Sequence, residues 1–460
     1  MSKKLFGTDG VRGIANVDLT PELAFQLGQS AGQVMLRHGH TPRAVIGRDT
    51  RRSGPMLGAA LGSGFCSVGV DVVAVGVAPT PAVSFFARTD DFGLGGIVSA
   101  SHNPAPDNGI KFVGHDGFKT TDEFEAEVEA LLGIPPEPRP RGRDVGSLAT
   151  VEAETETYVN YLVGLVPERL DGMRVAVDAA NGAAYRLAGE VLRRLGAEPV
   201  ETGVSPDGVN INAEGGATKP ATIQKFTQQA AADLGVAFDG DADRAVFSDS
   251  GGRLVNGDCT IGIWSAYWQR QGKLDPPVAV GTVMTNGGFE QYLLKQGIRL
   301  DRTPVGDKYV SDRIQETRAL VGGEQSGHII FREYGPTGDG LITMLQILRI
   351  VKRDGRPLSA LMDEYDTWPQ LLVNMSVRRR EGWNEGDKVS QALAKAELDL
   401  KGHGRLVVRP SGTQPMIRVM VEADSYPLRD AAAEAIIRAM CDEIGGEVYS
   451  RVDLTHALGD

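Results

Sequence analysis

Three aspartates alternate along the segment DGDADR, directly after a short apolar run. Asp239, Asp241 and Asp243 lie at spacing i, i+2 and i+4. At an effective dielectric constant of ~20, two carboxylates about 5 Å apart repel each other by roughly 3 kcal/mol. Three carboxylates at one strand end therefore indicate a bound cation that offsets this repulsion. Oxygen ligands favour Mg²⁺ or a similar hard ion. A solvated acidic turn would give the same pattern, and Arg244 is either an ion-pair partner for these carboxylates or a ligand for an incoming anion.

A second segment, SASHNP, offers the hydroxyl of Ser101 as a nucleophile, followed by His102. Serine is a weak nucleophile unless it is activated, and SHNP could equally be a plain β-turn. Lys111 is either an exposed lysine or a general acid or base whose pKa burial has lowered. With a phosphate on Ser101, a nearby metal and the cations Arg12, Lys111 and Arg244 could neutralise charge during phosphoryl transfer.

Two further loops have recognition chemistry. In GEQSGH, the alternating side chains of Glu324, Ser326 and His328 could hydrogen-bond adjacent hydroxyls of a sugar, although a lone histidine is more often simply packed. In RPSGTQP, Arg409 is followed by Ser, Gly and Thr, and Arg418 comes shortly after the loop. Guanidinium groups and backbone N–H donors in a tight loop form a phosphate-binding nest, whereas a plain hairpin turn would explain the arginines less well.

These loops need strands to position them, and apolar runs bounded by Gly, Pro, Asn and Asp recur in three groups. The predicted strands are 43–47, 70–77 and 95–101, then 173–179, 198–204 and 234–240, then 277–283, 298–305 and 319–324. Helical patterns separate them, which predicts three similar α/β domains with mixed, mainly parallel sheets. The third strand of each group runs into a polar loop, so we expect the loops to meet in one central cleft, at strand ends where helices begin.

The remaining sequence alternates differently and predicts a smaller C-terminal α+β domain, with strands at 371–377, 405–408 and 416–422 and helices near 388–398 and 427–441. The Pro- and Arg-rich segment 134–143 is interpreted as the linker after the first domain. The predicted domain ranges are 1–150, 151–254, 255–367 and 368–460.

Composition narrows the class of protein. The chain has 460 residues and a net charge of −12, which argues against a nucleic-acid partner. Three scattered cysteines and the lack of any long apolar stretch predict a cytoplasmic protein without disulfides, zinc or a membrane segment. No Walker or GxGxxG motif occurs, so the phosphoryl donor is expected to be the enzyme itself. The 58 glycines suggest many tight turns and ligand-binding loops.

The chain resembles the α-D-phosphohexomutase family over essentially its full length, and within it the bacterial phosphoglucosamine mutase branch. The motifs that carry the resemblance, in the family's order, are FGTDGVRG (6–13), GRDTRRSG (47–54), SASHNPAPDNGIKF (99–112), DGDADR (239–244), GGEQSGHI (322–329) and RPSGTQP (409–415). The resemblance implies four domains around a cleft. It also implies that Ser101 is a phosphoserine whose phosphate shares one Mg²⁺ with Asp239, Asp241 and Asp243.

The resemblance also assigns the other site residues. Glu324 and Ser326 would contact the sugar, with His328 as a helper, and Arg12 and Lys111 would lie near the transferred phosphate. The non-reacting phosphate of the substrate would be held by a group in the last domain: Arg409, Ser411, Gly412, Thr413 and Arg418. The catalytic set expected on this basis is Ser101, His102, Lys111, Arg12 and His328, and Arg244 is expected to bind substrate.

The activity implied by the resemblance is the interconversion of glucosamine 6-phosphate and glucosamine 1-phosphate through a bound 1,6-bisphosphate, feeding UDP-N-acetylglucosamine synthesis. A sugar 1,6-bisphosphate would then be an activator, and the protein would be a monomer or a homodimer. The alternatives are a phosphomannomutase or phosphoglucomutase of the same family, a metal-dependent phosphatase with a serine nucleophile, and a non-catalytic phosphosugar-binding protein.

Overall fold

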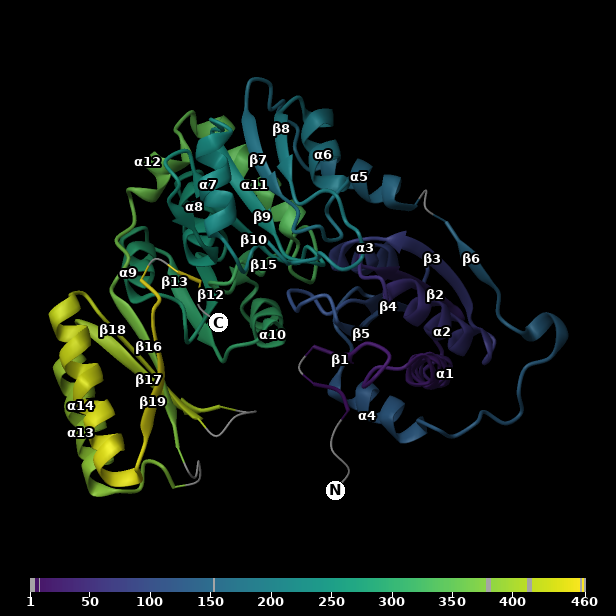
Figure 1. The fold of residues 1–460 in the computed structure, drawn as a ribbon. Coiled ribbons are helices and arrows are strands. Elements are labelled where there is room, and N and C mark those ends of the chain that lie inside the picture. The colour runs from purple at the N-terminus through teal and green to yellow at the C-terminus, as the bar shows by residue number, and fades with distance from the viewer. Residues whose placement is uncertain are drawn as a thin grey trace.

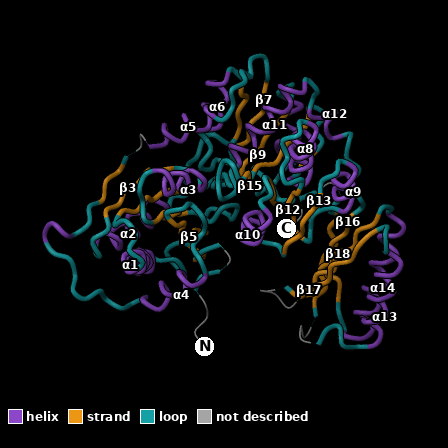
Figure 2. Tube along the Cα trace, turned by 180° about the vertical axis from the view of Figure 1, so that it is seen from behind, coloured by secondary structure: helices purple, strands orange, loops and turns teal. Residues whose placement is uncertain are grey.

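The four predicted domains follow one another along an arc in the computed structural model (Figure 1). It describes residues 5–7, 9–151, 154–377, 382–411, 416–455 and 457–458. The view from behind again places the first and the fourth domains at opposite ends of the arc (Figure 2). The predicted fold class, three α/β domains and a smaller α+β domain, is therefore confirmed. In the described part of the chain, no helix is both long and apolar enough to cross a membrane.

The first domain is built on a six-stranded sheet of order β1-β5-β4-β2-β3-β6, in which β1 and β5 are antiparallel to their neighbours and the other pairs are parallel. The strands are β1 (Val11–Ile14), β2 (Arg43–Arg48), β3 (Asp71–Val77), β4 (Leu94–Val98), β5 (Asp107–Gly114) and β6 (Leu148–Thr150). The helices are α1 (Pro21–Arg37), α2 (Gly54–Cys66), α3 (Thr80–Thr89) and α4 (Asp122–Leu131), with a 3₁₀ turn η1 (Gly142–Asp144). Every residue of β4 is buried, as expected for a strand covered on both faces.

The second domain repeats the pattern with a sheet of order β11-β10-β9-β7-β8. Its elements are α5 (Glu154–Gly164), β7 (Arg174–Asp178), α6 (Leu187–Leu195), β8 (Glu198–Thr202), α7 (Ala221–Gln229), β9 (Leu234–Phe238), β10 (Ala245–Asp249) and β11 (Leu254–Val255). Strands β7, β8 and β9 are parallel, while β10 and β11 are antiparallel to their neighbours. The proposed domain end at residue 254 falls inside β11.

The third domain has a four-stranded sheet of order β13-β12-β14-β15, with only β15 antiparallel. Its elements are α8 (Gly257–Arg270), β12 (Val278–Thr282), α9 (Gly287–Lys295), β13 (Arg299–Thr303), α10 (Asp307–Thr317), β14 (Val321–Gly323), β15 (Ile329–Phe331), α11 (Gly340–Asp354) and α12 (Leu358–Met362). Helix α11 begins at an Asp339 N-cap whose side chain accepts from the Ile342 N–H.

In each α/β domain, the polar loop connects the two strands of an equivalent hairpin. The serine loop (99–106) joins β4 to β5, the aspartate loop (239–244) joins β9 to β10, and the histidine loop (324–328) joins β14 to β15. In each case the returning strand pairs antiparallel with the one before it. The expectation that these loops lead into helices is wrong, because each loop is instead held at both ends by a sheet.

The fourth domain is an antiparallel sheet of order β17-β18-β16-β19. Its elements are β16 (Gln370–Ser376), α13 (Asp387–Leu400), β17 (Gly404–Pro410), β18 (Met416–Ala423), α14 (Tyr426–Ile444) and β19 (Glu447–Asp453). Both helices pack on one face of the sheet and enclose a separate apolar core around Val373, Val419 and Ile436.

One apolar cluster runs through the first three domains, including Phe86 of α3, Tyr158 of α5 and Trp264 of α8. The fourth domain is attached to this body through a much smaller cluster that contains Met284 and Leu372. Hydrogen bonds join the two domains as well, from the Gly287 N–H to Glu422 and from Arg405 to the Val283 and Thr285 carbonyl oxygens. Domains with separate cores can move relative to each other. Segment 134–143 is not an inter-domain linker, because it connects α4 to β6, which pairs with β3 in the first sheet.

Candidate active site

Ser101 occupies the turn of the serine loop in an unusual backbone conformation. Its φ is +49°, in the left-handed region that non-glycine residues seldom adopt. The side chain is buried, and its Oγ donates a 2.6 Å hydrogen bond to Oδ2 of Asp239 in the aspartate loop. The Nδ1 atom of His102 lies 3.4 Å from the same Oγ. The candidate nucleophile therefore faces the candidate metal ligands, with a histidine beside it.

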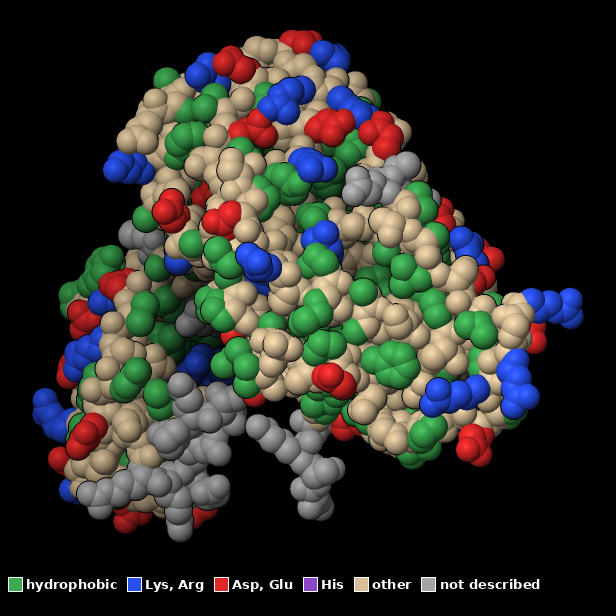
Figure 3. Space-filling view, turned by 45° about the vertical axis from the view of Figure 1, so that its right-hand side comes forward, with side chains coloured by type: hydrophobic (Ala, Val, Ile, Leu, Met, Phe, Trp, Pro, Cys, Tyr) green, Lys and Arg blue, Asp and Glu red, His purple; other side chains and the backbone are tan. Residues whose placement is uncertain are grey.

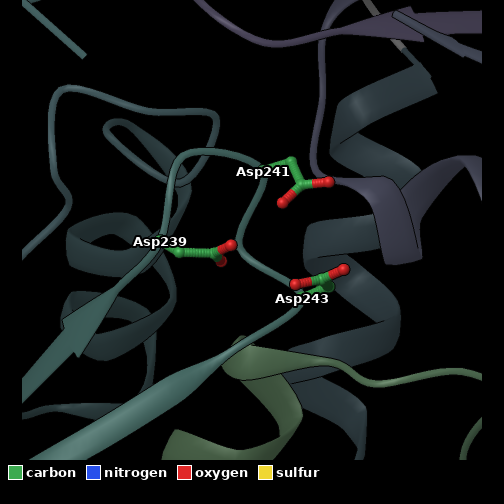
Figure 4. Close-up of side chains that lie close together, drawn as sticks. All are labelled: Asp239, Asp241 and Asp243. Atoms are coloured by element: carbon green, nitrogen blue, oxygen red, sulfur yellow. The ribbon is translucent and has the colours of Figure 1, made fainter. Parts of the chain in front are cut away.

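The aspartate loop brings three carboxylates to one point. Asp239, Asp241 and Asp243 are all buried and each offers an oxygen within 4.8 Å of the other two (Figure 4). Burial, followed by repulsion from Asp243 and Asp241, raises the pKa of Asp239 well above its usual value. Among the residues that the structure describes, Oδ1 of Asp241 and Oδ1 of Asp243 have no hydrogen-bond partner. Buried, unpartnered carboxylate oxygens fit a hard divalent cation.

Oδ2 of Asp241 is bound from the first domain by two donors. The Lys111 ammonium lies 2.8 Å from Oδ2, and the Thr80 hydroxyl, at the start of α3, lies 2.6 Å from it. Burial alone would raise the pKa of Asp241, but Lys111 and Thr80 lower it far below its usual value. Burial likewise acts to lower the pKa of Lys111, yet Asp241 and Asp243 raise it. Burial therefore acts in the expected direction, but the two carboxylates outweigh it, so the lowered pKa expected for a general acid or base is not found at Lys111.

Arginines of the first two domains add positive charge beside the carboxylates. Arg12 of β1 is paired with Asp9, and burial lowers the pKa of its guanidinium. The backbone N–H of Arg244 donates to Oδ1 of Asp239, and the side-chain Nε of Arg244 lies 3.9 Å from Oδ1 of Asp243. In the described ranges, the Nε atoms of Arg12 and Arg244 are both buried without a hydrogen-bond partner. Both side chains line the cavity described below, where they could bind an anion.

The histidine loop lies directly against the aspartate loop, since Arg244 and His328 form an antiparallel β-bridge. Oε1 of Glu324 accepts from the Gly306 N–H, which fixes this carboxylate at the cavity wall. His328 is buried, its Nε2 lies 3.6 Å from Asp307, and within the described residues neither ring nitrogen has a hydrogen-bond partner. A buried imidazole with free nitrogens can bind a hydroxyl or move a proton.

The fourth domain brings two arginines together. Arg409 of β17 and Arg418 of β18 are opposite each other in the strand pair. Burial, followed by repulsion from Arg418, lowers the pKa of Arg409. Like charges at opposed positions destabilise a strand pair, so this arrangement favours a bound anion. Ser411 is buried next to them, whereas the expected ligands Gly412 and Thr413 lie outside the described residues.

A cavity of about 970 Å³ joins these groups and is lined by all four domains. Figure 3 shows the hollow between the fourth domain and the rest of the molecule, with Lys or Arg side chains inside it. The sequence-predicted residues on its wall are Arg12, His102, Asp243, Arg244, Glu324, Ser326, His328 and Arg418. Ser101, Lys111, Asp239 and Asp241 are buried next to it through the contacts above, and Arg409 lies at an adjoining hollow that shares Arg418.

Sequence reasoning missed an ion-pair chain at the cavity. Lys119 bridges Asp9 and Asp307, at 2.8 Å and 2.5 Å. Burial acts to raise the pKa of Asp307, but Lys119 and His328 lower it far below its usual value. Asp307 follows the carboxyl end of β13, so the strand-end rule could have found it. Lys219, also on the wall, had no such signal.

The fold places a buried serine, three carboxylates and several arginines around one cavity, a site suited to phosphoryl transfer, and comparison with known proteins gives the family. The chain matches four domain families described as Phosphoglucomutase/phosphomannomutase: alpha/beta/alpha domain I (residues 3–133), domain II (156–252), domain III (256–368) and the C-terminal domain (372–439). The chain therefore belongs to the phosphoglucomutase/phosphomannomutase family of phosphohexomutases.

Its curated relatives carry a narrower name. The phosphoglucosamine mutase of Desulforamulus reducens is 46% identical over 444 residues, which covers 96% of this chain and 99% of the relative. The phosphoglucosamine mutase of Bacillus subtilis is 44% identical over 446 residues, 96% and 100% of the two chains. Among solved structures, a phosphoglucomutase/phosphomannomutase family protein from Burkholderia thailandensis matches with a TM-score of 0.80 and 25% identity, covering 97% of this chain and 99% of the other.

Proposed function

We propose that this protein is a phosphoglucosamine mutase, an isomerase that interconverts glucosamine 6-phosphate and glucosamine 1-phosphate. The observation that carries the proposal is the 2.6 Å contact of Ser101 with Asp239, beside a cavity that Arg418 of the fourth domain also lines. A nucleophile at one side and a phosphate-binding arginine pair at the other suit a substrate with a phosphate at one end and a reacting hydroxyl at the other. The choice of amino sugar rests on the relatives' names.

In the proposed reaction, phospho-Ser101 transfers its phosphoryl group to the free hydroxyl of the sugar phosphate. The Oγ–P bond breaks, a P–O bond to the sugar forms, the sugar hydroxyl loses its proton, and Oγ of Ser101 gains one. The resulting 1,6-bisphosphate rotates by half a turn in the cavity and transfers its other phosphoryl group, the one the substrate brought, to Ser101. Arg12, Lys111 and Arg244 supply positive charge around the moving group, and the free ring nitrogens of His328 exchange the hydroxyl proton.

The carboxylates of Asp239, Asp241 and Asp243, with the phosphate on Ser101, would hold one Mg²⁺ per subunit. When bound, the ion acts as a Lewis acid that withdraws charge from the phosphoryl oxygens. Thr80 and Lys111 both bind Oδ2 of Asp241, which leaves its Oδ1 available as a ligand. A sugar 1,6-bisphosphate would act as activator, because it can restore a phosphate to Ser101 after an intermediate has been lost.

Arg418 and Arg409, with Ser411, Gly412 and Thr413, are proposed to bind the phosphate that does not react. Glu324 and Ser326 would contact the sugar, and the negative charge of Glu324 complements an ammonium substituent. Because the fourth domain has its own core and shares only a small apolar cluster with the third, we expect it to swing open so that the intermediate can turn and the product can leave. The monomeric or dimeric state, the cytoplasmic location and the domain ranges given above remain predictions.

A phosphomannomutase or phosphoglucomutase activity is the second candidate, since the matching family carries those names. Turnover of the 1-phosphates of glucosamine, glucose and mannose, each with Mg²⁺ and a sugar bisphosphate, tests the assignment. We expect the highest kcat/KM with the glucosamine ester and no steady release of inorganic phosphate. Equal or greater efficiency with mannose 1-phosphate would contradict the substrate assignment, and continuous phosphate release would indicate a phosphatase.

A further inference from the structure

The carbonyl oxygens of the serine loop are bound by a fully buried arginine. Arg51, which follows β2, is 0% exposed. Its guanidinium donates to the carbonyl oxygens of Ser101, Asn103 and Pro104, at 3.0, 2.8 and 2.6 Å. A planar guanidinium with several donors in fixed directions can hold three oxygens in one arrangement, which a flexible ammonium cannot do.

Arg51 is itself held by a buried carboxylate. Asp49 accepts hydrogen bonds from the Arg51 N–H and Nε, both at 2.9 Å. The Ser99 hydroxyl also donates to Asp49, at 2.6 Å, and the Ser101 N–H donates to the same hydroxyl, at 2.9 Å. These hydrogen bonds form a closed chain that runs from the Ser101 carbonyl through Arg51, Asp49 and the Ser99 hydroxyl back to the Ser101 N–H. Both backbone polar groups of the nucleophile are thereby fixed.

A second donor reaches the same oxygens from the second domain. The Asn212 side-chain amide donates to the carbonyl oxygen of Ser101, at 2.9 Å, and to that of Asn103, at 3.1 Å. The aspartate loop also approaches the serine loop closely, since a methyl group on Gly240 would lie 2.5 Å from the Ser101 carbonyl oxygen. The serine loop is therefore bound from both sides of the seam between the first two domains.

We propose that Arg51 and Asn212 are positioning residues that keep Ser101 in its left-handed conformation and so keep its Oγ aimed at Asp239. A serine at φ +49° tends to relax to ordinary backbone values, which would turn the side chain away from the aspartate loop. Arg51 and Asn212 bind backbone carbonyl oxygens of the serine loop and not the Ser101 hydroxyl, so they affect the reaction only by fixing the position of Ser101. This inference rests on the proposed function, in which Ser101 carries the phosphoryl group.

The test compares Arg51→Lys and Asn212→Ala with Arg52→Lys, a control at the neighbouring exposed arginine. Because a displacement of about 1 Å can cost about 100-fold in rate, we expect kcat to fall about 100-fold in both positioning variants. We expect the KM for the sugar phosphate to stay within about twofold, since the arginine pair that binds its phosphate is untouched. Phosphorylation of Ser101 by glucose 1,6-bisphosphate, followed by intact mass, should slow by a similar factor. The control should match the wild type.

The outcomes separate the two proposals. Wild-type kcat and wild-type phosphorylation rates in Asn212→Ala and Arg51→Lys would overturn the positioning role and leave the proposed function standing. If Arg51→Lys does not fold, Asn212→Ala, which leaves the Asp49 and Arg51 pair intact, decides the matter. A wild-type protein that takes no phosphate on Ser101 would overturn the proposed function and this inference with it.

Discussion

The hydroxyl of Ser101 and the carboxylate of Asp239 are hydrogen-bonded at 2.6 Å although 138 positions separate them in the sequence. Both residues lie in the turn of a hairpin, one in the first domain and one in the second. A second contact across the same seam, in which the Thr80 N–H donates to the Asp241 carbonyl at 3.0 Å, fixes the two loops relative to each other. The candidate nucleophile and the candidate metal ligands are thus brought together by the packing of two domains.

Asp243→Asn should weaken Mg²⁺ binding and abolish most activity, because it removes one anionic ligand whose Oδ1 has no hydrogen-bond partner in the described chain. A chelator should likewise remove activity from the wild type, and added Mg²⁺ should restore it. Calorimetric titration of Mg²⁺ measures the affinity directly. Asp233→Asn, at an exposed carboxylate of the same domain, is the control. Wild-type Mg²⁺ affinity in Asp243→Asn would contradict the metal assignment.

Arg418→Gln should raise the KM for the sugar phosphate by about 30-fold, the equivalent of losing about 2 kcal/mol from one charged hydrogen bond. The thermal stability of the protein should stay equal or rise, because the substitution relieves repulsion from Arg409. Steady-state kinetics and melting curves measure the two effects. Arg438→Gln, on the exposed side of α14, should change neither. An unchanged KM in Arg418→Gln would exclude Arg418 from phosphate binding.

Gly338→Ala should lower kcat by at least about 10-fold, because the new methyl group would lie 2.4 Å from Nε2 of His328 and displace the ring. Gly335→Ala provides a matched control three positions away, where within the described residues no atom lies within 4 Å of the added carbon. Initial rates at saturating substrate make the comparison. Equal rates in the two variants would show that the position of the His328 ring is unimportant for turnover.

Asp258→Asn should change how stability depends on pH. Burial raises the pKa of Asp258 from 3.8 to about 6. Between these values the folded protein keeps a proton that the unfolded chain has lost, so this group makes the protein less stable as pH rises, by up to about 3 kcal/mol above pH 6. The amide cannot ionise and its oxygen can still accept from Asn286. We therefore expect calorimetry to show a larger gain in Tm at pH 7.5 than at pH 5, and equal effects would contradict the assignment.

The loops of the candidate site could be predicted from the sequence because their polar residues are concentrated in short segments that follow buried strands. The loops around Ser101, Asp239 and His328 were found in this way, and the structure brings them together. The returning strands were missed, since β15 has only three residues and since β5 and β10 are buried along nearly their whole length, polar residues such as Lys111 and Ser248 included, so that no alternation of apolar and polar residues marks them. Contacts across domain seams, such as Asn212 with Ser101, have no local sequence signal.

The excess of glycine was predicted to serve turns and ligand loops, and this is only part of its role. Helices α1 and α2 also approach each other through glycines. A methyl group on Gly28 would lie 2.1 Å from the Leu61 carbonyl oxygen, and one on Gly64 would lie 2.1 Å from that of Phe25. Close helix packing therefore uses some of the glycines, a tertiary requirement that composition alone does not distinguish from loop formation.

The central claim, that Ser101 carries the phosphoryl group, is tested most directly by the mass of the protein. Purified wild type and Ser101→Ala are incubated with glucose 1,6-bisphosphate and examined by intact-mass and peptide analysis, beside activity measurements. The account predicts one phosphoryl group on Ser101 in the wild type, and neither phosphate nor activity in the variant. An unmodified Ser101 under all conditions, together with activity that survives in Ser101→Ala, would contradict it.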